Sequence, residues 1–371
     1  MLHWLLLIIM DTFCVSVGSF LLMDIARILK VRGAGKLSKR KFSAANSKVK
    51  EIPPEYFEYL SEFEELELQI NMLENLPSEA EAMISLLSLN LGSNRFKTLP
   101  PSVGTLKRLE KLSLYKNCIS DISGIVFSSL QNLKFLNLNQ NKLTELPPEV
   151  GGLRMLESLS VEYNELSYLP EELSNATSLK ELRLGFNRLQ FLPIKLGNLT
   201  ELQILNIPAN RLRELPETFA NLVGLIDLDV SGNCLTYFPS NFDSLKLRDF
   251  HCENNTLITY ETVYSYQEPV VFSLKEIAAR VLLQELRKRG SLIAKVVYKM
   301  PKIYDLLSAA GQCAVCRQYF LHTWLECVRF VDSQEVMGTN TRNGLIPIRA
   351  QVCSYKCFNN RTEDLFGVAK L

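Results

Sequence analysis

The feature that most constrains this chain is an asparagine that recurs at a nearly fixed spacing. Nine such asparagines follow one another at intervals of 22 to 24 residues. Around each of them the sequence follows the pattern LxxLxLxxNxL, and most units continue as xxLP. A period of this length is typical of a repeat structure, because one unit cannot bury its own apolar face and a stack of units can. The nine residues are Asn71, Asn94, Asn117, Asn141, Asn164, Asn187, Asn210, Asn233 and Asn255.

This period predicts a leucine-rich-repeat solenoid of the α/β class, with about nine units of 23 residues over residues 51–258. Each LxxLxL segment supplies a short strand whose leucines point into the coil. The asparagine side chain lies inside the turn, where it satisfies backbone groups that would otherwise be buried without partners. The LP element is predicted to end the convex segment, since proline cannot donate to a strand ladder.

The same frame predicts the concave face, the surface formed by the outward-pointing side chains of the repeat strands and of the residues just after them. Solenoids bind partners through such extended surfaces, and exposed aromatic side chains anchor proteins. The alternative is that these aromatic residues are scattered surface residues without a function. We predict a protein-binding face whose central residues are Tyr115, Phe135, Asn137, Glu162, Tyr163, Arg183 and Phe186.

Charge divides the chain into three blocks, with net charges of +7 for residues 1–50, −11 for 51–255 and +5 for 256–371. The acidic centre argues against a nucleic-acid partner, because phosphate binding requires a basic surface. Trp4 to Met23 is a run of 20 residues with one charge, which is long enough to span a bilayer. Residues 1–50 are therefore predicted to be a leader that is a membrane anchor, a disordered segment or a gene-model artefact. The basic residues after the run predict a cytoplasmic location for the repeats in each case.

Residues 259–310 break the repeat period and predict a helical segment. In the stretch SLKEIAARVLLQELRKRG, Ser273 and Glu276 fit a capping box, with serine at the N-cap and glutamate three residues later. An apolar stripe with helical spacing follows, and we expect the helix to cover the last repeat with it. Whether the stripe only closes the solenoid or also binds a partner stays open. Its members are Leu274, Ile277, Ala278, Val281 and Leu282.

Residues 311–371 contain four of the nine cysteines as two close pairs, Cys313 with Cys316 and Cys353 with Cys357. Zinc is held by four tetrahedral soft ligands, which two such pairs supply. The alternatives are four buried thiols or disulfides, but the repeats lack the flanking cysteine clusters that cap many secreted repeat proteins, which favours a reducing compartment. We predict a small zinc-ribbon-like tail with a structural Zn²⁺. Substitute ligands are Cys327 and His322.

A resemblance adds to this reading. The pattern of Ser273, Leu274, Ala278 and Leu282 resembles the BC box, the helix by which substrate receptors bind elongin C. The element that contains Met300, Pro301 and Tyr304 is similar to the start of a cullin-2 box, although Ser308 stands where that box has an apolar residue. With the repeats and the cysteine pairs, residues 63–358 resemble the leucine-rich repeat-containing protein 58 family.

This resemblance implies a substrate-receptor subunit of a cullin–RING ubiquitin ligase. Elongins B and C would be recruited through the BC-box-like residues, and a cullin through Met300, Pro301 and Tyr304. The repeats would hold a protein substrate, and the chain would be a monomer within a hetero-complex. The second hypothesis is a repeat scaffold in intracellular signalling that has no association with a ligase.

An enzyme is the competing class. His251 is predicted on the concave face, with Asp229 at the equivalent position one repeat earlier, where a carboxylate could orient an imidazole. Cys252, however, stands at an inward leucine position, and the sequence has no glycine-rich phosphate loop and no metal motif with an open position. We therefore predict that the chain is not an enzyme.

Overall fold

The structure of the protein is a computed structural model that describes residues 41–258, 273–288, 291–308, 310–321, 325–333, 344–354, 357 and 366–370. The chain divides into two compact units, Met1–Arg211 and Leu212–Leu371. Within the described ranges, no helix combines the length and the apolar character that crossing a bilayer requires. The run from Trp4 to Met23, predicted as a membrane anchor or a disordered leader, lies outside these ranges.

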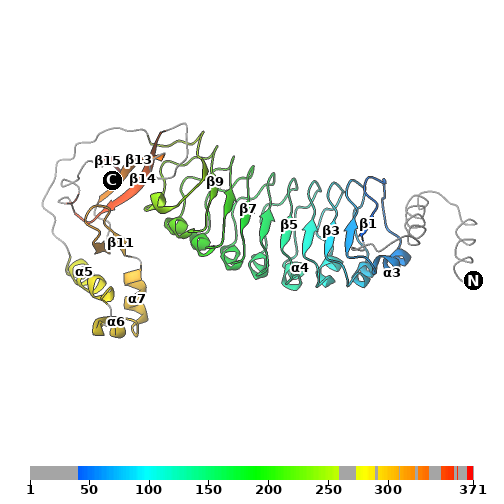
Figure 1. Ribbon diagram of the computed structural model, residues 1–371, viewed down its shortest axis with the longest axis horizontal. Helices are drawn as coiled ribbons and strands as arrows, with labels where there is room; N and C mark the ends of the chain where they lie inside the picture. Colours follow the sequence, from blue (N-terminus) through cyan, green and yellow to red (C-terminus); the bar gives the residue numbers. More distant parts are fainter. Residues whose placement is uncertain are drawn as a thin grey trace, which may run out of the picture. The chain divides into compact units, whose positions relative to one another are not determined.

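Ten short parallel strands follow one another in the order of the sequence (Figure 1). The central residues of neighbouring strands face one another, as Leu112 faces Leu136. Both leucines are fully buried, so the strands pack their leucines into the coil as predicted. The fold is a leucine-rich-repeat solenoid of the α/β class. The strands are β1 (Lys41–Ser43), β2 (Glu65–Glu67), β3 (Ser88–Asn90), β4 (Lys111–Ser113), β5 (Phe135–Asn137), β6 (Ser158–Ser160), β7 (Glu181–Arg183) and β8 (Ile204–Asn206) in the first unit, and β9 (Asp227–Asp229) and β10 (Asp249–His251) in the second.

Short helices, most of them 3-10 turns, connect the strands, and in the first unit they lie on the side opposite the strands (Figure 1). Proline stands at the N-cap of most of these turns, as Pro147 does before η4, where the Val150 N–H donates to the Pro147 carbonyl. The prediction that LP ends the convex segment is therefore wrong. Proline begins the turn, because its fixed φ suits a helix start and its missing N–H costs nothing there. The helices are η1 (Pro54–Tyr56), α3 (Phe57–Leu60), η2 (Ser78–Ala82), η3 (Pro101–Thr105), α4 (Gly124–Ser129), η4 (Pro148–Gly152), η5 (Glu171–Asn175), η6 (Ile194–Asn198), η7 (Glu217–Asn221) and η8 (Phe242–Ser244).

The repeated asparagines do what the sequence predicts. Asn141 Oδ1 accepts the N–H of Ile119 at 3.0 Å. Its Nδ2 donates to the carbonyl oxygens of Leu114 at 2.9 Å and Leu138 at 3.0 Å. One buried side chain therefore satisfies backbone groups of two successive turns, and this arrangement recurs along the solenoid.

The period predicts nine units, whereas the solenoid sheet of the described residues has ten strands. The additional strand, β1, lies within the segment predicted as a leader, and its Phe42 faces Leu66 of β2. Ser47 stands where later turns have the asparagine, and its N–H donates to Asn71 Oδ1. A search for the LxxLxLxxN pattern misses this turn because Phe42, Ala44 and Ser47 replace its characteristic residues.

The residue just before each repeated asparagine has a left-handed backbone. For example, φ is 56° at Gln140, 55° at Tyr163 and 57° at Phe186. Glycine is the residue that adopts this region without steric cost, yet in this series glycine stands only at Gly232. The left-handed turn redirects the chain after every strand, so the side chains at this position form one edge of the concave face.

Beyond the repeats, the described residues of the second unit form three helices and five further strands. β11 pairs with β12 in an antiparallel hairpin, and β13 lies between β14 and β15 in an antiparallel sheet. β13 and β14 are apolar-rich segments, LECVRFVD and LIPIRAQV, that contain the β-branched residues typical of strands. The elements are α5 (Leu274–Leu286), α6 (Leu292–Val297), α7 (Pro301–Ser308), β11 (Gly311–Gln312), β12 (Tyr319–Phe320), β13 (Leu325–Asp332), β14 (Leu345–Val352) and β15 (Phe366–Lys370).

The last repeat is joined to β14. The Phe238 N–H donates to the carbonyl of Pro347 at 2.8 Å, and the Arg349 N–H donates to the carbonyl of Phe238 at 2.7 Å. Arg349 also pairs with Glu217 at 2.9 Å. The prediction that the helix at residues 274–286 covers this repeat is wrong, because α5 packs on β12 and α6. The backbone groups of β14 provide a partner for the repeat that an apolar helix face cannot supply.

Candidate partner-binding helix and metal centre

Helix α5 has the predicted N-cap residue, Ser273, but it does not bury the face that carries the predicted apolar stripe. Ser273 Oγ accepts the N–H of Glu276 at 3.2 Å, which satisfies one free donor of the first turn. The Glu276 side chain turns inward, is 3% exposed, and accepts the N–H of Leu321 at 3.1 Å. The face of α5 that is buried consists of Glu276, Ala279 and Leu283.

The predicted apolar stripe of α5 therefore points to solvent. Leu274 is 86% exposed, Ile277 is 47% exposed and Val281 is 55% exposed. Ala278 is also exposed, and Leu282 is half-buried. Three of the four BC-box-like residues, Ser273, Leu274 and Ala278, thus share an exposed surface on the described part of the chain, while Leu282 packs against the cluster that contains Ala279 and Leu283.

An apolar hollow lies beside this surface, between α5, α6 and α7. It has a volume of about 320 Å³. Leu282 and Met300, one from each predicted partner motif, both contribute to it. Pro301 begins α7, and Tyr304 is 43% exposed, with its ring 5.4 Å from that of Tyr298. The other lining residues are Leu292, Ile293, Val296, Val297 and Ile303.

The two cysteine pairs come together. The sulfur atoms of Cys313, Cys316, Cys353 and Cys357 all lie within 4.8 Å of one another. Cys353 Sγ is 3.5 Å from both Cys316 Sγ and Cys357 Sγ. Four sulfurs bound to one zinc at 2.3 Å lie about 3.8 Å apart, whereas a disulfide requires about 2 Å. The donor set and its spacing fit a tetrahedral metal ion.

The β11–β12 hairpin positions the first pair. The Cys313 N–H donates to the Gln318 carbonyl at 2.8 Å, and Arg317 turns the chain with φ of 60°. Burial raises the pKa of the Cys313 thiol, but N–H groups of the surrounding backbone outweigh that effect and lower it. One of these donors is the N–H of Cys353, 3.4 Å from Cys313 Sγ. These donors favour the thiolate form at Cys313, whereas burial raises the pKa of Cys316 and of Cys353.

The substitute ligands have different positions. Cys327 lies on β13, is 2% exposed, and donates from Sγ to the Ala350 carbonyl at 3.3 Å. It is therefore a core residue of the sheet and is not among the four grouped sulfurs. His322 lies outside the described residues.

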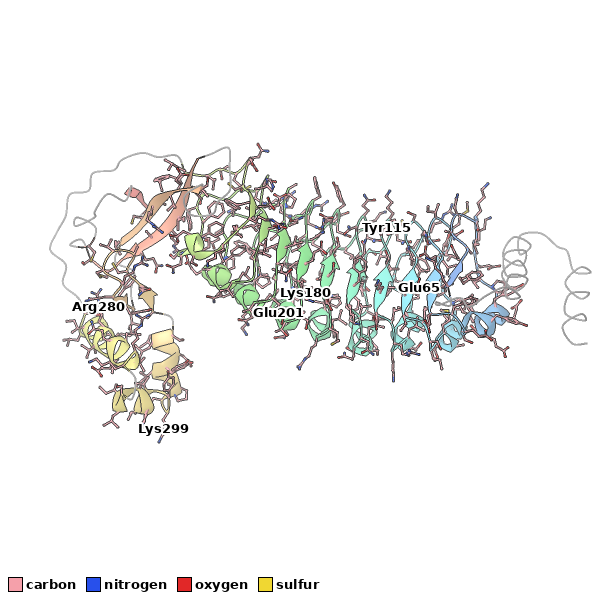
Figure 2. The ribbon with its side chains drawn as sticks, viewed as in Figure 1. Glu65, Tyr115, Lys180, Glu201, Arg280 and Lys299 are labelled. Atoms are coloured by element: carbon pink, nitrogen blue, oxygen red, sulfur yellow. The ribbon has the colours of Figure 1, made fainter. Side chains whose placement is uncertain are left out.

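Sequence reasoning missed the residue that joins α5 to this centre. Arg280 Nη2 donates to the carbonyl oxygen of Cys353 at 2.9 Å, and Arg280 Nε donates to Glu276 Oε1 at 2.7 Å (Arg280 is labelled in Figure 2). The side chains of Arg280 and Glu276 are 17% and 4% exposed. The available signal was a Glu and an Arg four residues apart beside Ala279 and Leu283. That spacing is also typical of an exposed ion pair.

The concave face carries one stacked aromatic pair among the predicted residues. The rings of Tyr163 and Phe186 are 4.2 Å apart between centroids with an interplanar angle of 6°. Both remain exposed, at 48% and 45%. Tyr115 lies over Gly92, where a Cβ would come within 2.1 Å of its ring (Tyr115 is labelled in Figure 2).

The remaining predicted residues of this face are half-buried: Phe135, Asn137, Glu162 and Arg183. Asn137 Oδ1 accepts the N–H of Asn139 at 3.0 Å. Burial raises the pKa of Glu162. The positive charge of Arg183 acts in the opposite direction and lowers this pKa, but the effect of burial is larger. Polar groups that are held by neighbours in this way, next to an exposed aromatic pair, suit recognition of another protein.

The residues considered for catalysis do not converge. His251 Nδ1 is 4.0 Å from Glu253, while Asp229 Oδ1 accepts from the N–H and Oγ of Ser231 at 2.9 and 2.7 Å. Cys252 is fully buried, and burial raises its thiol pKa to about 12. These three residues therefore provide neither an oriented imidazole nor an accessible nucleophile.

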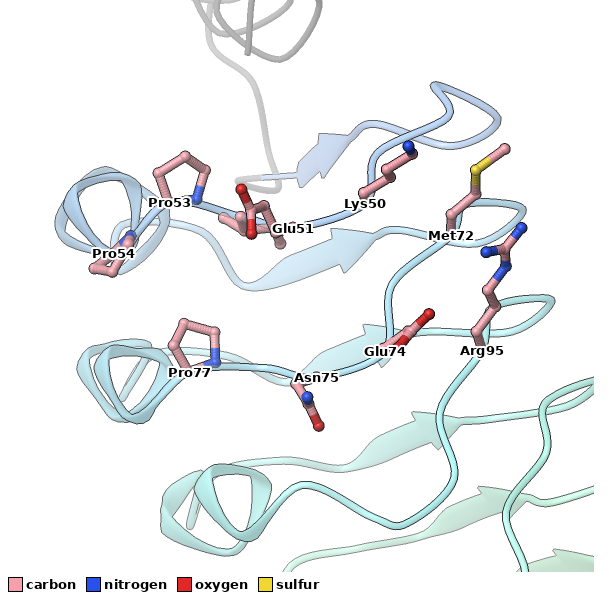
Figure 3. Close-up of a pocket in the computed structure, with 10 residues that line it drawn as sticks. Lys50, Glu51, Pro53, Pro54, Met72, Glu74, Asn75, Pro77 and Arg95 are labelled. Atoms are coloured by element: carbon pink, nitrogen blue, oxygen red, sulfur yellow. The ribbon is translucent and has the colours of Figure 1, made fainter. Parts of the chain in front are cut away.

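A larger groove of about 740 Å³ lies over the first turns of the solenoid (Figure 3). Its charged lining residues have both signs: Lys50 and Arg95 against Glu51 and Glu74. Its lining contains no serine, cysteine or histidine. This groove is therefore a surface of the repeat turns that lacks these three residue types.

Comparison with known proteins supports the assignment of the repeated turns as leucine-rich repeats. Residues 84–143 match the family model described as "Leucine rich repeat". Leucine-rich repeat-containing protein 69 of Xenopus laevis is 40% identical over 33% of this chain and 36% of its own length. The Mus musculus protein of that name is 40% identical over 35% of this chain and 37% of its own length. The match thus spans little more than a third of these relatives.

Among solved structures, the functional domain of InlJ from Listeria monocytogenes superposes with a TM-score of 0.52 and 24% identity, over 60% of this chain and 46% of that one. This similarity shows the fold. Solenoids of this kind generally bind proteins through their extended concave surfaces. The resemblance of residues 63–358 to the leucine-rich repeat-containing protein 58 family stays a prediction.

Proposed function

We propose that this protein is a substrate receptor of a cullin–RING ubiquitin ligase. In this proposal the repeats, residues 51–258, hold a protein substrate in the cytoplasm. Residues 259–310 recruit elongins B and C and a cullin, and residues 311–371 hold a structural zinc ion. The observation that carries the proposal is Leu274, which is 86% exposed at the end of an uncovered apolar stripe.

The exposed apolar stripe of α5 is a candidate surface for binding another protein. An amphipathic helix normally buries its apolar stripe, and exposed apolar patches on a folded protein mark interaction sites. On α5 the inner face is already occupied, since Glu276 binds the Leu321 N–H. The outer face with Leu274 and Ile277 is then free to enter a groove on another protein, which is a common mode of helix recognition.

The hollow beside α5 supports a second contact. Met300 is 46% exposed and lines the hollow, and Tyr304 is 43% exposed on α7. In the resemblance stated above, Met300, Pro301 and Tyr304 contact a cullin. Because Ser308 is polar and exposed, we expect that contact to end before the last turn of α7.

The metal proposal rests on the four grouped thiols. Four thiolate ligands fill the coordination sphere of Zn²⁺ and leave no open position, so the ion would stabilise the fold and would not catalyse a reaction. Cys313 is fully buried, as expected for a structural site. The alternative function, a scaffold without a ligase, requires neither this centre nor the exposed stripe of α5.

The test is a binding measurement between the purified full chain and the elongin B–elongin C complex, by biolayer interferometry. The variant carries Leu274→Asp and Ala278→Asp, which place two charges on the exposed stripe. The matched control is Ile125→Asp on α4, because Ile125 is 79% exposed and lies far from α5 in the sequence. Binding by the parent and the control that is lost in a folded variant supports the receptor. Absence of binding by the folded parent leaves the scaffold as the better hypothesis.

A further inference from the structure

We infer that the four-cysteine centre fastens α5, so that metal binding decides whether this helix is held in place. The inference concerns contacts within the second unit. Its consequence, metal-dependent capture of elongin C, rests on the function proposed above.

The contacts run from the cysteines to the helix through buried polar groups. Arg280 donates to the carbonyl of Cys353, which is itself one of the four grouped cysteines, at 2.9 Å. Glu276 accepts the N–H of Leu321, which directly follows the hairpin that holds Cys313 and Cys316, at 3.1 Å. The two residues are bonded to each other, so α5 is bound to both cysteine-bearing segments by one ion pair.

The apolar contacts of α5 form one small cluster. Its Ala279 and Leu283 are buried with Val297 and Leu307, and Leu282 and Leu286 of the same helix pack against them. A helix of 13 residues is marginal on its own in water, so its order depends on what holds its inner face. The ion pair with its backbone acceptor and donor therefore adds to this small cluster in ordering α5.

The cysteine-bearing segments in turn depend on the metal. Among the described residues, the core around the cysteines has six buried members with Ala314, Val315 and Cys357 packed against them, and three of the six are cysteines, Cys313, Cys327 and Cys353. So small a core does not hold a hairpin and a strand end together without a cross-link or a metal. Removal of the metal would leave Cys353 and Leu321 free to move, and the acceptor and donor of the α5 ion pair would move with them.

Hydrogen–deuterium exchange of the full chain tests this inference. The zinc content per chain is measured on the same samples by inductively coupled plasma mass spectrometry. We expect one zinc per chain, and chelation should raise amide exchange in residues 279–286 about tenfold. Peptides from η4 and η5 should exchange unchanged. Arg280→Gln should keep its zinc and show the faster exchange, whereas Lys275→Gln, at an exposed position on the same helix, should behave as the parent.

Two results would overturn the inference: zinc removal that leaves the exchange of α5 unchanged, or a zinc-supplemented chain that binds no zinc. Binding of elongin B–elongin C is measured on the same samples. If α5 responds to zinc but never binds the elongins, the fastening is supported and the proposed partner is refuted. If the elongins bind equally well with and without zinc, metal control of capture is refuted.

Discussion

Tyr163 and Phe186 stack face to face across consecutive repeats, 4.2 Å apart between ring centroids, while almost half of each side chain stays in contact with water. Both rings project from left-handed residues that precede repeated asparagines. Because successive turns repeat the same backbone, equivalent positions face each other, and two aromatic residues there stack. The pair is a preformed apolar platform on the edge of the concave face.

The stack should contribute measurable coupling. In a double-mutant cycle of Tyr163→Ala and Phe186→Ala, we expect an interaction free energy of unfolding of about 0.5–1.5 kcal/mol, because stacked rings gain more than their buried area alone gives. Denaturant unfolding of the parent, the two single variants and the double variant measures it. Phe191→Ala combined with Tyr163→Ala is the control, since Phe191 is exposed but is not in the stack. Additive effects in both cycles would contradict the prediction.

Two adjacent glycines should respond differently to alanine. A Cβ on Gly151 would lie 1.9 Å from the backbone carbonyl oxygen of Glu172, whereas a Cβ on Gly152 would meet nothing within 4 Å. Gly151→Ala forces the turns apart, and we expect it to lower the free energy of unfolding by about 1–3 kcal/mol. Gly152→Ala should change it by less than about 1 kcal/mol. Equal denaturation midpoints for the two variants would refute the close approach of η4 and η5.

Removal of a repeated asparagine should destabilise the solenoid. Asn141→Ala leaves the Ile119 N–H and the Leu114 and Leu138 carbonyls with one partner fewer, which costs about 1–3 kcal/mol. Asn198→Ala, at an exposed position in η6, should have little effect. Urea unfolding with unchanged slope and a lower midpoint would support the prediction. A midpoint equal to that of Asn198→Ala would not.

The thiols outside the metal centre should differ in reactivity. Burial raises the pKa of Cys252 to about 12, so at pH 8 only about one in 10,000 of these thiols is the reactive thiolate. Cys118 and Cys234 are exposed. We expect N-ethylmaleimide to label these two within minutes and Cys252 only after unfolding, as measured by mass spectrometry of the peptides. Labelling of native Cys252 at the rate of Cys234 would show that its turn opens.

The solenoid could be predicted because its asparagines and leucines repeat a requirement of the backbone. An asparagine such as Asn141 is needed in every turn whose buried backbone groups lack other hydrogen-bond partners. A search for the repeated pattern therefore finds it. The first turn was missed because Ser47 stands in place of the asparagine, and its hydroxyl meets part of the same need by donating to the Ala45 carbonyl at 3.3 Å. The sequence alone could not show whether the LP proline ends or begins the convex segment. Proline lacks a backbone N–H, and this suits both the end of a strand and the start of a helix.

The orientation of α5 could not be predicted from its own residues. An apolar stripe predicts a buried face only when the partner surface belongs to the same chain. Here Glu276 and Arg280 are buried because they bind Leu321 and Cys353, and these lie 45 and 73 residues further along the chain. Sequence spacing within a helix carries no information about such distant acceptors and donors. The grouping of the four cysteines, by contrast, follows from two close pairs.

The left-handed residue before each repeated asparagine has a consequence for how this surface can change. Its backbone conformation is set by the turn and is the same for isoleucine at Ile70, lysine at Lys116 and phenylalanine at Phe186, with φ of 60°, 52° and 57°. Side-chain chemistry along that edge is thus independent of the path of the chain. Successive substitutions there could exchange one recognition specificity for another while the coil beneath them keeps its dimensions.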